Sequence, residues 1–309
     1  AIRASDQFKL PFSIQNCVGA LFNSFEYYDN RINRNNWEAD GYGGPGYFGL
    51  GGASYATTGT SPFIFNTTAL IDHIEIYSPT QSVMLQLSVD GVMYLLDQPD
   101  PDRSNSVMNV YMVTLNTPST PSIQVMSTDG SRKALLAGMI AYCQTDGACV
   151  VNCGVGGSST NDWTDPRCQT NLSHVLECYQ PDLIIQNICI NNHWHSIDLQ
   201  APGSGTDSTL YGQQLQILDS IYKSCNVPVL YYTPNAASPD MTPVSTQSLY
   251  CDVLRQMCIH NNRPLYDLYN HTQSYDYMVS QGWAGGNDPC HPTPVGYKMI
   301  ATEIFNRIL

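Results

Sequence analysis

Residues 183–195 read LIIQNICINNHWH, an apolar run that ends in a group of polar and aromatic side chains. A short apolar run of this kind is typical of a strand buried on both faces. Strand-like segments recur along this half of the chain, as CVVN from Cys149, VPVLYYT from Val227 and PLYDL from Pro264. Helical patterns lie between and after them, near 167–179, 209–224 and 246–260 and from Val295 onward. The alternation predicts an α/β fold, in which helices cover a parallel sheet.

The stretch from Ser61 to Cys143 has a different pattern. It contains short runs rich in β-formers, such as IDHIEIY and VMLQLSV, with Asp90-Gly91 and Asp129-Gly130 as expected hairpin turns. This pattern predicts an all-β sandwich inserted into the α/β domain. We therefore expect residues 1–60 to be the N-terminal part of the α/β domain, 61–143 the inserted module and 144–309 the main part of the α/β domain.

The charge balance excludes two classes of partner. The chain has 13 Lys and Arg against 26 Asp and Glu, a net charge of −13, which disfavours nucleic acid and anionic membrane surfaces. No stretch approaches the roughly 18 apolar residues of a membrane span, and the first residues, AIRASDQF, lack the basic flank and apolar run of a secretion signal. We expect a soluble protein with neither a nucleic-acid nor a membrane partner.

Eleven cysteines, ten of them between Cys143 and Cys290, lack the CxxC spacing of a structural zinc site. No metal site is therefore expected. Several cysteines lie in apolar stretches, where a free thiol behaves as a small hydrophobic side chain. We expect mostly reduced thiols, with some disulfides as the alternative.

Asp288-Pro-Cys-His291-Pro precedes the last helical pattern. A carboxylate three residues before a histidine can accept the imidazole Nδ1 proton and turn Nε2 toward a nucleophile. The alternative is an ordinary surface turn, since Asp, Pro and His are common in loops.

Two further motifs follow expected strands. VVNCGVGGSST ends a strand in Gly154, Gly156 and Gly157, where a backbone N–H can point into the crevice at the edge of a parallel sheet. Asn191 and Asn192 follow the next strand, either at the same crevice or as caps of a turn. A phosphate-binding loop is disfavoured because GxGxxG and a following P-loop lysine are absent.

Together, and in this order, the three motifs resemble those of the SGNH (GDSL-type) hydrolase family, over residues 149–309. The resemblance implies a flavodoxin-like three-layer parallel sheet and ester hydrolysis without a cofactor. NCGVGG is similar to the second family block, which implies that Gly157 is a backbone oxyanion donor. CINN is similar to the third block, with Asn191 as the side-chain oxyanion donor, although Cys189 and Asn192 replace the family's Gly and Asp. DPCHP is similar to the fifth block and implies that Asp288 and His291 are the acid and base of a triad.

The first family block departs from the pattern, because this chain contains no GDS. Ser5-Asp6-Gln7-Phe8 is the nearest match and would place Gln7 where the nucleophile belongs. A shifted register makes Ser5 the nucleophile, after AIRA, and a longer shift makes it Ser13, after FKLPF. We favour Ser5, because Pro11 would remove a ladder hydrogen bond from a central strand before Ser13.

Four tryptophans, Trp37, Trp163, Trp194 and Trp283, all lie outside 61–143. Trp163, Trp194 and Trp283 follow or precede the motifs, so their indoles can stack on sugar faces at a cleft. Core positions are the alternative. The module 61–143 has no Trp to stack on sugars, so a structural or assembly role, such as homo-oligomer formation, is expected for it at least as much as glycan binding.

The leading hypothesis is a serine esterase that removes a small acyl group, most simply acetyl, from a carbohydrate. A small ester is an equivalent substrate. The alternative is a catalytically dead protein of the same fold with a structural or glycan-binding role, such as a phage or viral surface component in an extracellular or virion location.

Overall fold

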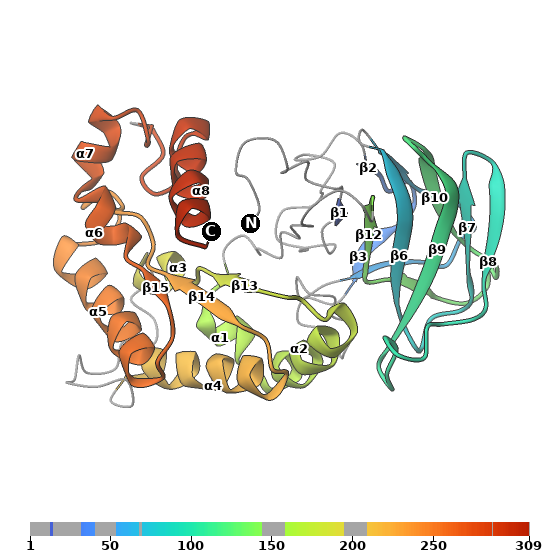
Figure 1. Cartoon of the computed structure of the whole chain (residues 1–309), viewed down its shortest axis with the longest axis horizontal. Helices are drawn as coiled ribbons and strands as arrows, with labels where there is room; N and C mark the ends of the chain where they lie inside the picture. Colours follow the sequence, from blue (N-terminus) through green and yellow to red (C-terminus); the bar gives the residue numbers. More distant parts are fainter. Residues whose placement is uncertain are drawn as a thin grey trace. The chain divides into compact units, whose positions relative to one another are not determined.

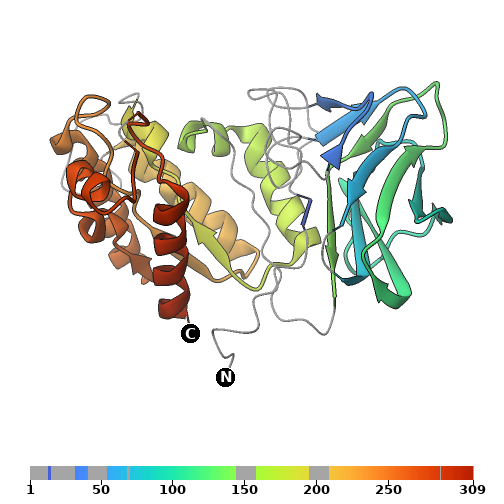
Figure 2. The ribbon, with the colours of Figure 1, turned by 90° about the horizontal axis from the view of Figure 1, so that it is seen from above.

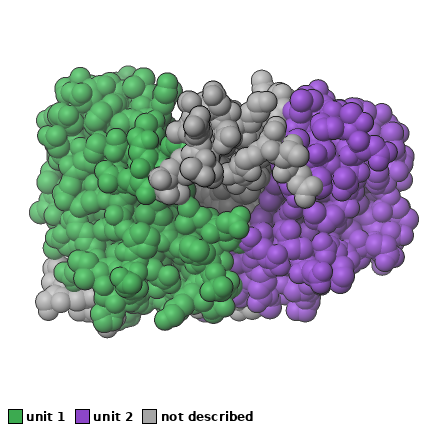
Figure 3. Space-filling view, in the orientation of Figure 1, with its two compact units in different colours: residues 1, 157–165, 181–309 green, residues 2–156, 166–180 purple. Residues whose placement is uncertain are grey.

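The computed structural model describes residues 13–14, 32–40, 54–67, 70–143, 158–194, 209–285 and 287–308. The chain divides into two compact units, coloured separately in Figure 3. The β unit comprises Ile2–Gly156 and Pro166–Gln180, and the α/β unit comprises Ala1, Gly157–Asp165 and Pro181–Leu309.

Three antiparallel sheets make up the β unit. The four-stranded sheet contains, in order, β1 (Ser13–Ile14), β12 (Gly138–Tyr142), β6 (Ile71–Pro79) and β9 (Met108–Ser119). The five-stranded sheet contains β2 (Ile32–Asn33), β5 (Phe63–Asn66), β10 (Ser122–Ser127), β7 (Leu85–Val89) and β8 (Val92–Leu96). The three-stranded sheet contains β11 (Ala134–Leu136), β4 (Ser54–Thr57) and β3 (Glu38–Asp40).

Side chains from all three sheets form one hydrophobic core. Phe63 and Phe65 of β5, and Ile123 of β10, are fully buried in it with Ile74 and Ile76 of β6. The alternation of buried and less buried residues along β10 is the period of two expected for a strand with one face on a core. Each such buried side chain contributes about 1.5–3 kcal/mol of transfer free energy.

One of the two expected hairpin turns is confirmed. Asp90 and Gly91 both have positive φ, 48° and 85°, and join β7 to β8 with Val89 paired to Val92. Positive φ at both central residues is the requirement of a type I′ turn. The Asp129-Gly130 expectation is wrong, because β10 before it and β11 after it pair with different strands. There the Asp129 side chain accepts hydrogen bonds from Ser131 and Arg132 and forms a local turn.

The boundary expected between residues 60 and 61 does not divide the sheets. Strand β1 pairs with β12, with Ser13 opposite Ile140, while β2 pairs with β5 and β4 pairs with β11. The described strands before residue 61 therefore belong to the β unit. They have only two to four residues each, too short to leave a periodic signal, and they obtain backbone partners by joining existing sheet edges. Trp37 is buried in the β core, where its Nε1 donates to the Ser61 carbonyl at 2.8 Å.

Helix α2 (Pro166–Tyr179) also belongs to the β unit, although the sequence placed it in the α/β domain. Its buried residues Val175 and Cys178 pack against Tyr77, Met108 and other residues of the four-stranded sheet. Strand β6 is therefore covered on both faces, with Ile74 and Ile76 toward the β core and Tyr77 toward α2. This double cover explains why β6 is buried along most of its length.

An ion pair between the buried Glu75 and the half-buried Arg103 helps to hold α2 on the sheet. The Arg103 guanidinium donates to the carbonyl of Cys178 at 2.7 Å and to the Glu75 carboxylate at 3.2 Å. Glu75 also accepts a hydrogen bond from the Tyr77 hydroxyl. The Tyr77 ring stacks on the Tyr179 ring, with 3.8 Å between their centroids. Each polar atom named here has a partner, as burial in a sheet–helix interface requires.

The α/β unit is built on a parallel sheet of three described strands, β13 (Ile184–Gln186), β14 (Val229–Tyr232) and β15 (Leu265–Tyr266). Around it are α1 (Thr160–Trp163), α3 (Ile190–Trp194), α4 (Leu210–Ser224), α5 (Val244–His260), α6 (Leu268–Thr272), α7 (Tyr275–Ser280) and α8 (Pro294–Ile308). The helical patterns expected near 209–224 and 246–260 and from Val295 are confirmed as α4, α5 and α8.

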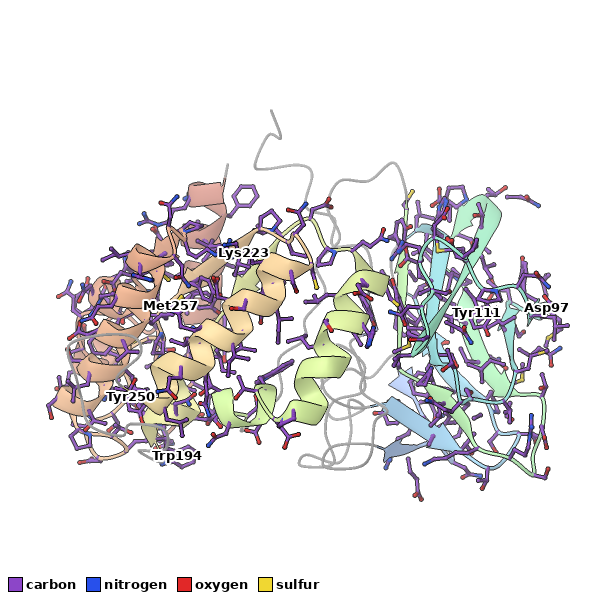
Figure 4. The ribbon with its side chains drawn as sticks, turned by 90° about the horizontal axis from the view of Figure 1, so that it is seen from below. Asp97, Tyr111, Trp194, Lys223, Tyr250 and Met257 are labelled. Carbon is purple, nitrogen blue, oxygen red and sulfur yellow. The ribbon has the colours of Figure 1, made fainter. Side chains whose placement is uncertain are left out.

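Helices lie on both faces of this sheet (Figures 1 and 2). Ile300 and Ile304 of α8 pack with Leu230 and Tyr266 on one face. On the other face the Tyr231 hydroxyl donates to Asp219 of α4 at 2.9 Å. Figure 4 shows α4 beside α5, with Lys223 on α4 and Tyr250 and Met257 on α5.

Every cysteine whose bonding state is described is a free thiol, namely Cys143, Cys178, Cys189, Cys225, Cys251, Cys258 and Cys290. Among the described helices, none combines the length and the apolar character needed to cross a bilayer.

Candidate active site

The two ends of the turn that carries Asp288 and His291 are held together by backbone contacts. Ala284 forms an antiparallel bridge with Pro292, and the Thr293 N–H donates to the Trp283 carbonyl at 2.8 Å. Helix α8 begins directly afterwards with Pro294 at its first position, where proline's fixed φ suits a helix start and its missing N–H is not needed. The Thr293 hydroxyl accepts from the Gly296 N–H at 3.2 Å and caps the helix.

Within this turn the Asp288 carboxylate faces the His291 ring. The His291 Nδ1 lies 3.0 Å from Asp288 Oδ2 and 3.1 Å from Oδ1. Oδ1 also accepts from the backbone N–H groups of His291 and Cys290, at 2.8 and 3.0 Å. Both side chains reach the surface, with 65% of His291 and 48% of Asp288 exposed. The arrangement holds Nδ1 against the Asp288 carboxylate, and Nε2, which lies 4.0 Å from Cys290 Sγ, is on the side of the ring opposite that carboxylate.

The surroundings favour the ionised form of Asp288. Partial burial opposes ionisation, but the two backbone N–H groups and the nearby imidazole outweigh it and lower the pKa of Asp288 below its usual range. Cys290, between the two residues, behaves differently. Its burial and the neighbouring Asp288 charge raise the pKa of the Cys290 thiol to about 12, so it stays protonated at neutral pH.

Backbone contacts from two other elements support the turn. The Tyr275 hydroxyl of α7 lies 2.8 Å from the Gly285 carbonyl and 2.6 Å from the Asp288 carbonyl. The loop after β14 contributes the Asn235 side chain, which donates to the Cys290 carbonyl at 2.9 Å, and the Ser238 N–H, which donates to the Pro289 carbonyl at 2.7 Å. None of these contacts was expected from the sequence, because each joins residues that are distant in the chain or lie in irregular backbone.

Asn191 lies on α3, a short helix that begins four residues after β13. Its Nδ2 donates to the carbonyl of Ser158 at 2.9 Å. Asn192 is fully buried, and its Nδ2 donates to the Thr160 hydroxyl at 2.6 Å, which in turn donates to Gln214 of α4. Helix α3 is therefore tied to the residues that directly follow Gly157, which itself lies outside the described residues.

The loop between β14 and α5 contacts both halves of the candidate site. Asn235 and Ser238 hold the Asp288–His291 turn, as described above, and Thr242 in the same loop donates its hydroxyl to the His193 carbonyl of α3 at 3.4 Å. Strands β13 and β14, which precede α3 and this loop, are parallel, so their carboxyl ends lie at one edge of the sheet. This edge is where open α/β sheets bind ligands.

Of the two nucleophile candidates, Ser5 lies outside the described residues, as does Gln7. Ser13 is in β1, opposite Ile140 in an antiparallel pair within the β unit. It therefore does not stand on a turn between a parallel strand and a helix, as the hypothesis for Ser13 requires. The reason is that Ser13 and Ile14 pair at the edge of the four-stranded sheet of the β unit instead of following a central strand of the α/β sheet.

The three tryptophans have different surroundings. Trp163 donates its Nε1 to the Ser158 hydroxyl at 3.0 Å, next to the carbonyl that Asn191 contacts. Trp194 on α3 is 48% exposed, and Figure 4 labels it at the end of that helix. Trp283 stacks on His271 at 5.9 Å between centroids and packs against a buried cluster, so it has the contacts of a structural residue.

His193 on α3 was given no role by the sequence. It is fully buried, and neither ring nitrogen has a hydrogen-bond partner. Burial lowers the pKa of His193 to about 4. No sequence signal marks this histidine as buried, because its burial comes from packing near Tyr250 of α5.

Comparison with known proteins gives the following results. The family model described as GDSL-like lipase/acylhydrolase matches residues 121–299. No curated protein sequence matches the chain. The solved structure of a peptidoglycan O-acetylesterase is similar with a TM-score of 0.68 and 14% identity, covering 96% of this chain and 82% of that chain. That similarity shows an α/β fold of the SGNH hydrolase type.

Two further solved structures have lower similarity. One is the acetyl xylan esterase AlAXEase, with a TM-score of 0.40, 18% identity and coverage of 53% of this chain and 80% of that chain. The other is a mutant of Axe2, an acetyl-xylooligosaccharide esterase from Geobacillus, with a TM-score of 0.40, 20% identity and coverage of 52% and 73%.

Proposed function

This chain belongs to the GDSL-like lipase/acylhydrolase family of carboxylic ester hydrolases, and we propose that it removes a small acyl group, acetyl first of all, from a carbohydrate. The observation that carries the proposal is the Asp288–His291 pair, 3.0 Å apart on a turn held by Tyr275 and Asn235. The acetylated glycan is suggested by the name of the solved peptidoglycan O-acetylesterase that is similar over most of the chain.

In the proposed mechanism His291 is the general base. Its Nδ1–H is held by the ionised Asp288, so the lone pair is on Nε2, which takes the proton of the attacking serine. Asp288 stabilises the imidazolium that forms. The acetyl group forms an ester with the serine as its bond to the sugar oxygen breaks, and that oxygen takes the proton from His291. A water molecule, deprotonated by His291, then attacks the acetyl-serine ester, and acetate leaves as the serine regains its proton. Because Asp288 accepts two backbone N–H groups as well, its orientation is fixed before the substrate arrives.

The oxyanion would lie between the Gly157 N–H, the Asn191 side-chain amide and the N–H of the nucleophile. Support for this assignment is the hydrogen bond from Asn191 to Ser158, which places the amide beside the chain segment that follows Gly157. On substrate binding the Asn191 Nδ2, which has two protons, can keep this bond and donate the second proton to the oxyanion.

We assign the nucleophile to Ser5, because Ser13 lies in β1. Trp163 and Trp194 are proposed to border the substrate, since one contacts Ser158 and the other follows Asn191 on the same helix.

The remaining architecture is proposed as follows. The parallel sheet is part of a flavodoxin-like three-layer domain, and the β unit is a sandwich-like module with an assembly role, such as homo-oligomer formation. An extracellular or surface location suits a glycan substrate.

A fluorophosphonate probe tests the proposal, because it reacts with a serine only where a base and an oxyanion hole activate it. We expect stoichiometric labelling of the wild type, mapped by mass spectrometry to the peptide containing Ser5, and no labelling of His291→Ala. Labelling of another serine would assign the role of nucleophile to that residue instead of Ser5. Absence of labelling, together with no hydrolysis of p-nitrophenyl acetate or acetylated glycans, would favour the catalytically dead, glycan-binding alternative.

A further inference from the structure

Three potential metal ligands of different chemistry converge on the turn at residues 288–291. A carboxylate oxygen of Asp288, the Sγ of Cys290 and a ring nitrogen of His291 all lie within 4.8 Å of one another. Among the described residues no other group of three or more His, Cys, Asp or Glu side chains meets this condition. We propose that these three residues form a Zn²⁺ site, and that zinc bound there inhibits the enzyme reversibly.

Two of the three spacings between ligand atoms are close to those that zinc imposes, and the third, between Asp288 and Cys290, is within 4.8 Å. His291 Nδ1 lies 3.0 Å from Asp288 Oδ2 and 3.3 Å from Cys290 Sγ. Tetrahedral zinc with Zn–N and Zn–O bonds of about 2.1 Å and a Zn–S bond of about 2.3 Å places N and O about 3.4 Å apart and N and S about 3.6 Å apart. Shifts of a few tenths of an ångström would bring these two spacings to the values of a tetrahedral zinc site.

The backbone of the site is held by contacts that do not involve the ligand atoms. The carbonyls of Asp288, Pro289 and Cys290 are hydrogen-bonded to Tyr275, Ser238 and Asn235. The ligands therefore lie on a prearranged turn, which reduces the ordering that metal binding requires. The exposed Asp288 and His291 side chains give an ion access from solvent, and water can complete the coordination, as in zinc sites with three protein ligands.

Binding changes the protonation of the site in a defined way. The Cys290 thiol releases its proton to solvent, and the sulfur lone pair forms the bond to zinc. Zinc binds the Nδ1 lone pair of the neutral imidazole. The single ring proton must then be on Nε2. The Nδ1–H bond to Asp288 is lost, and Asp288 becomes a zinc ligand. No electron transfer and no further reactant are needed.

Inhibition follows if His291 is the catalytic base, and this part rests on the proposed function. With Nδ1 bound to zinc, Nε2 carries a proton and cannot accept one from serine. Cys290 distinguishes this turn from an ordinary acid–histidine pair as a metal site. Its soft thiolate favours the binding of zinc over that of magnesium or calcium.

Metal binding itself is measured on the full chain, without an activity assay. Protein freed of metal with EDTA is titrated with Zn²⁺ in an isothermal titration calorimeter and with Co²⁺ in a spectrophotometer. We expect one Zn²⁺ per chain and a thiolate-to-cobalt absorption band in the near ultraviolet. Cys290→Ser should weaken zinc binding by about tenfold or more and abolish the band, while the matched control Cys225→Ser should retain both.

Equal zinc affinity in the wild type and in folded Cys290→Ser, with folding checked by circular dichroism, would overturn the site. If Cys290→Ser does not fold, Asp288→Asn replaces it, and unchanged zinc affinity in that variant would be equally decisive.

The inhibition is tested separately on p-nitrophenyl acetate. We expect zinc to reduce wild-type turnover at the same concentration at which it binds, and EDTA to restore it. Zinc should inhibit Cys290→Ser less than it inhibits the wild type. The turnover of this variant with zinc, divided by its turnover without zinc, should therefore be closer to one. Stoichiometric binding without inhibition would refute the regulatory role and count against His291 as the base, whereas hydrolysis without any zinc binding would refute the metal site alone.

Discussion

Asn191 lies on α3 and His291 on the turn before α8, yet the proposed reaction needs both at one carbonyl group. His291→Ala removes the base and should lower kcat on p-nitrophenyl acetate by roughly 10⁴-fold or more. Asn191→Ala removes one oxyanion donor and should lower kcat by roughly 10²- to 10³-fold.

Asn187→Ala is the matched control for Asn191. Asn187 follows β13 as well, and its side chain donates to the carbonyls of Tyr232 and Thr233 at the end of β14, at 3.5 and 3.3 Å. We expect its kcat to stay within a few-fold of the wild type. If Asn191→Ala and Asn187→Ala had the same small effect, the oxyanion role of Asn191 would be refuted.

His193 predicts a specific acid sensitivity. Its pKa is about 4 in the folded protein, compared with about 6.5 in an unfolded chain. Below pH 6.5 the unfolded chain therefore binds a proton that the folded chain does not, and stability falls as the pH drops from about 6.5 to about 4. The full loss from this group is on the order of 3 kcal/mol.

Replacing His193 with Leu removes both the titration and two unpartnered buried nitrogens. The free energy of unfolding of His193→Leu, from urea titrations at several pH values, should depend less on pH between 6.5 and 4 than that of the wild type. Exposed His260→Gln should keep the wild-type slope. An unchanged slope in His193→Leu would assign the acid sensitivity to other groups.

At the scale of elements, the join between the active-site turn and α8 depends on Gly296. A Cβ at this position would lie 2.2 Å from the Trp283 carbonyl oxygen and 2.9 Å from the Pro292 Cβ. The first of these is backbone and cannot rotate away, so Gly296→Ala must displace the start of α8 or the bridge at Ala284 and Pro292. We expect it to lower stability by about 1–3 kcal/mol and to lower kcat.

Gly285→Ala provides a comparison within the same turn, since its added Cβ would meet only the Thr293 Cγ2 at 3.9 Å. Thermal unfolding followed by circular dichroism, together with kcat, should separate the two variants. Equal melting temperatures would show that the turn adapts to a side chain at Gly296.

At the scale of the whole molecule, each unit has its own buried clusters. Phe65 is fully buried in a core whose described members all belong to the β unit. Phe65→Ala should destabilise that core by about 3–5 kcal/mol. Hydrogen exchange measured by mass spectrometry should show lost protection in β5 and β10, with β14 of the α/β unit retaining its protection.

Leu95→Ala on β8 is the control for Phe65→Ala, because Leu95 is 54% exposed and its truncation leaves no cavity. It should leave exchange in β5 and β10 unchanged. An equal loss of protection in β14 on Phe65→Ala would mean that the two units unfold as one.

The sequence by itself determined the features that arise from neighbouring residues. The apolar periods of α4, α5 and α8 lie within each segment, and Asp90-Gly91 contains the two residues that a tight hairpin needs. The Asp288–His291 pairing was also predictable, because three residues on a turn bring a carboxylate to an imidazole without help from the rest of the chain.

Only the tertiary structure decided the features that depend on partners distant in the sequence. The short strands β1 to β4 join sheets whose other strands lie beyond residue 60, and α2 packs on the outer face of β6 about a hundred residues before it. Cys290 becomes a candidate metal ligand because the loop after β14 and Tyr275 hold its turn, and His193 loses its hydrogen-bond partners because it packs near α5. Backbone pairing and burial are properties of surfaces that meet only after folding, so no local pattern of residues encodes them.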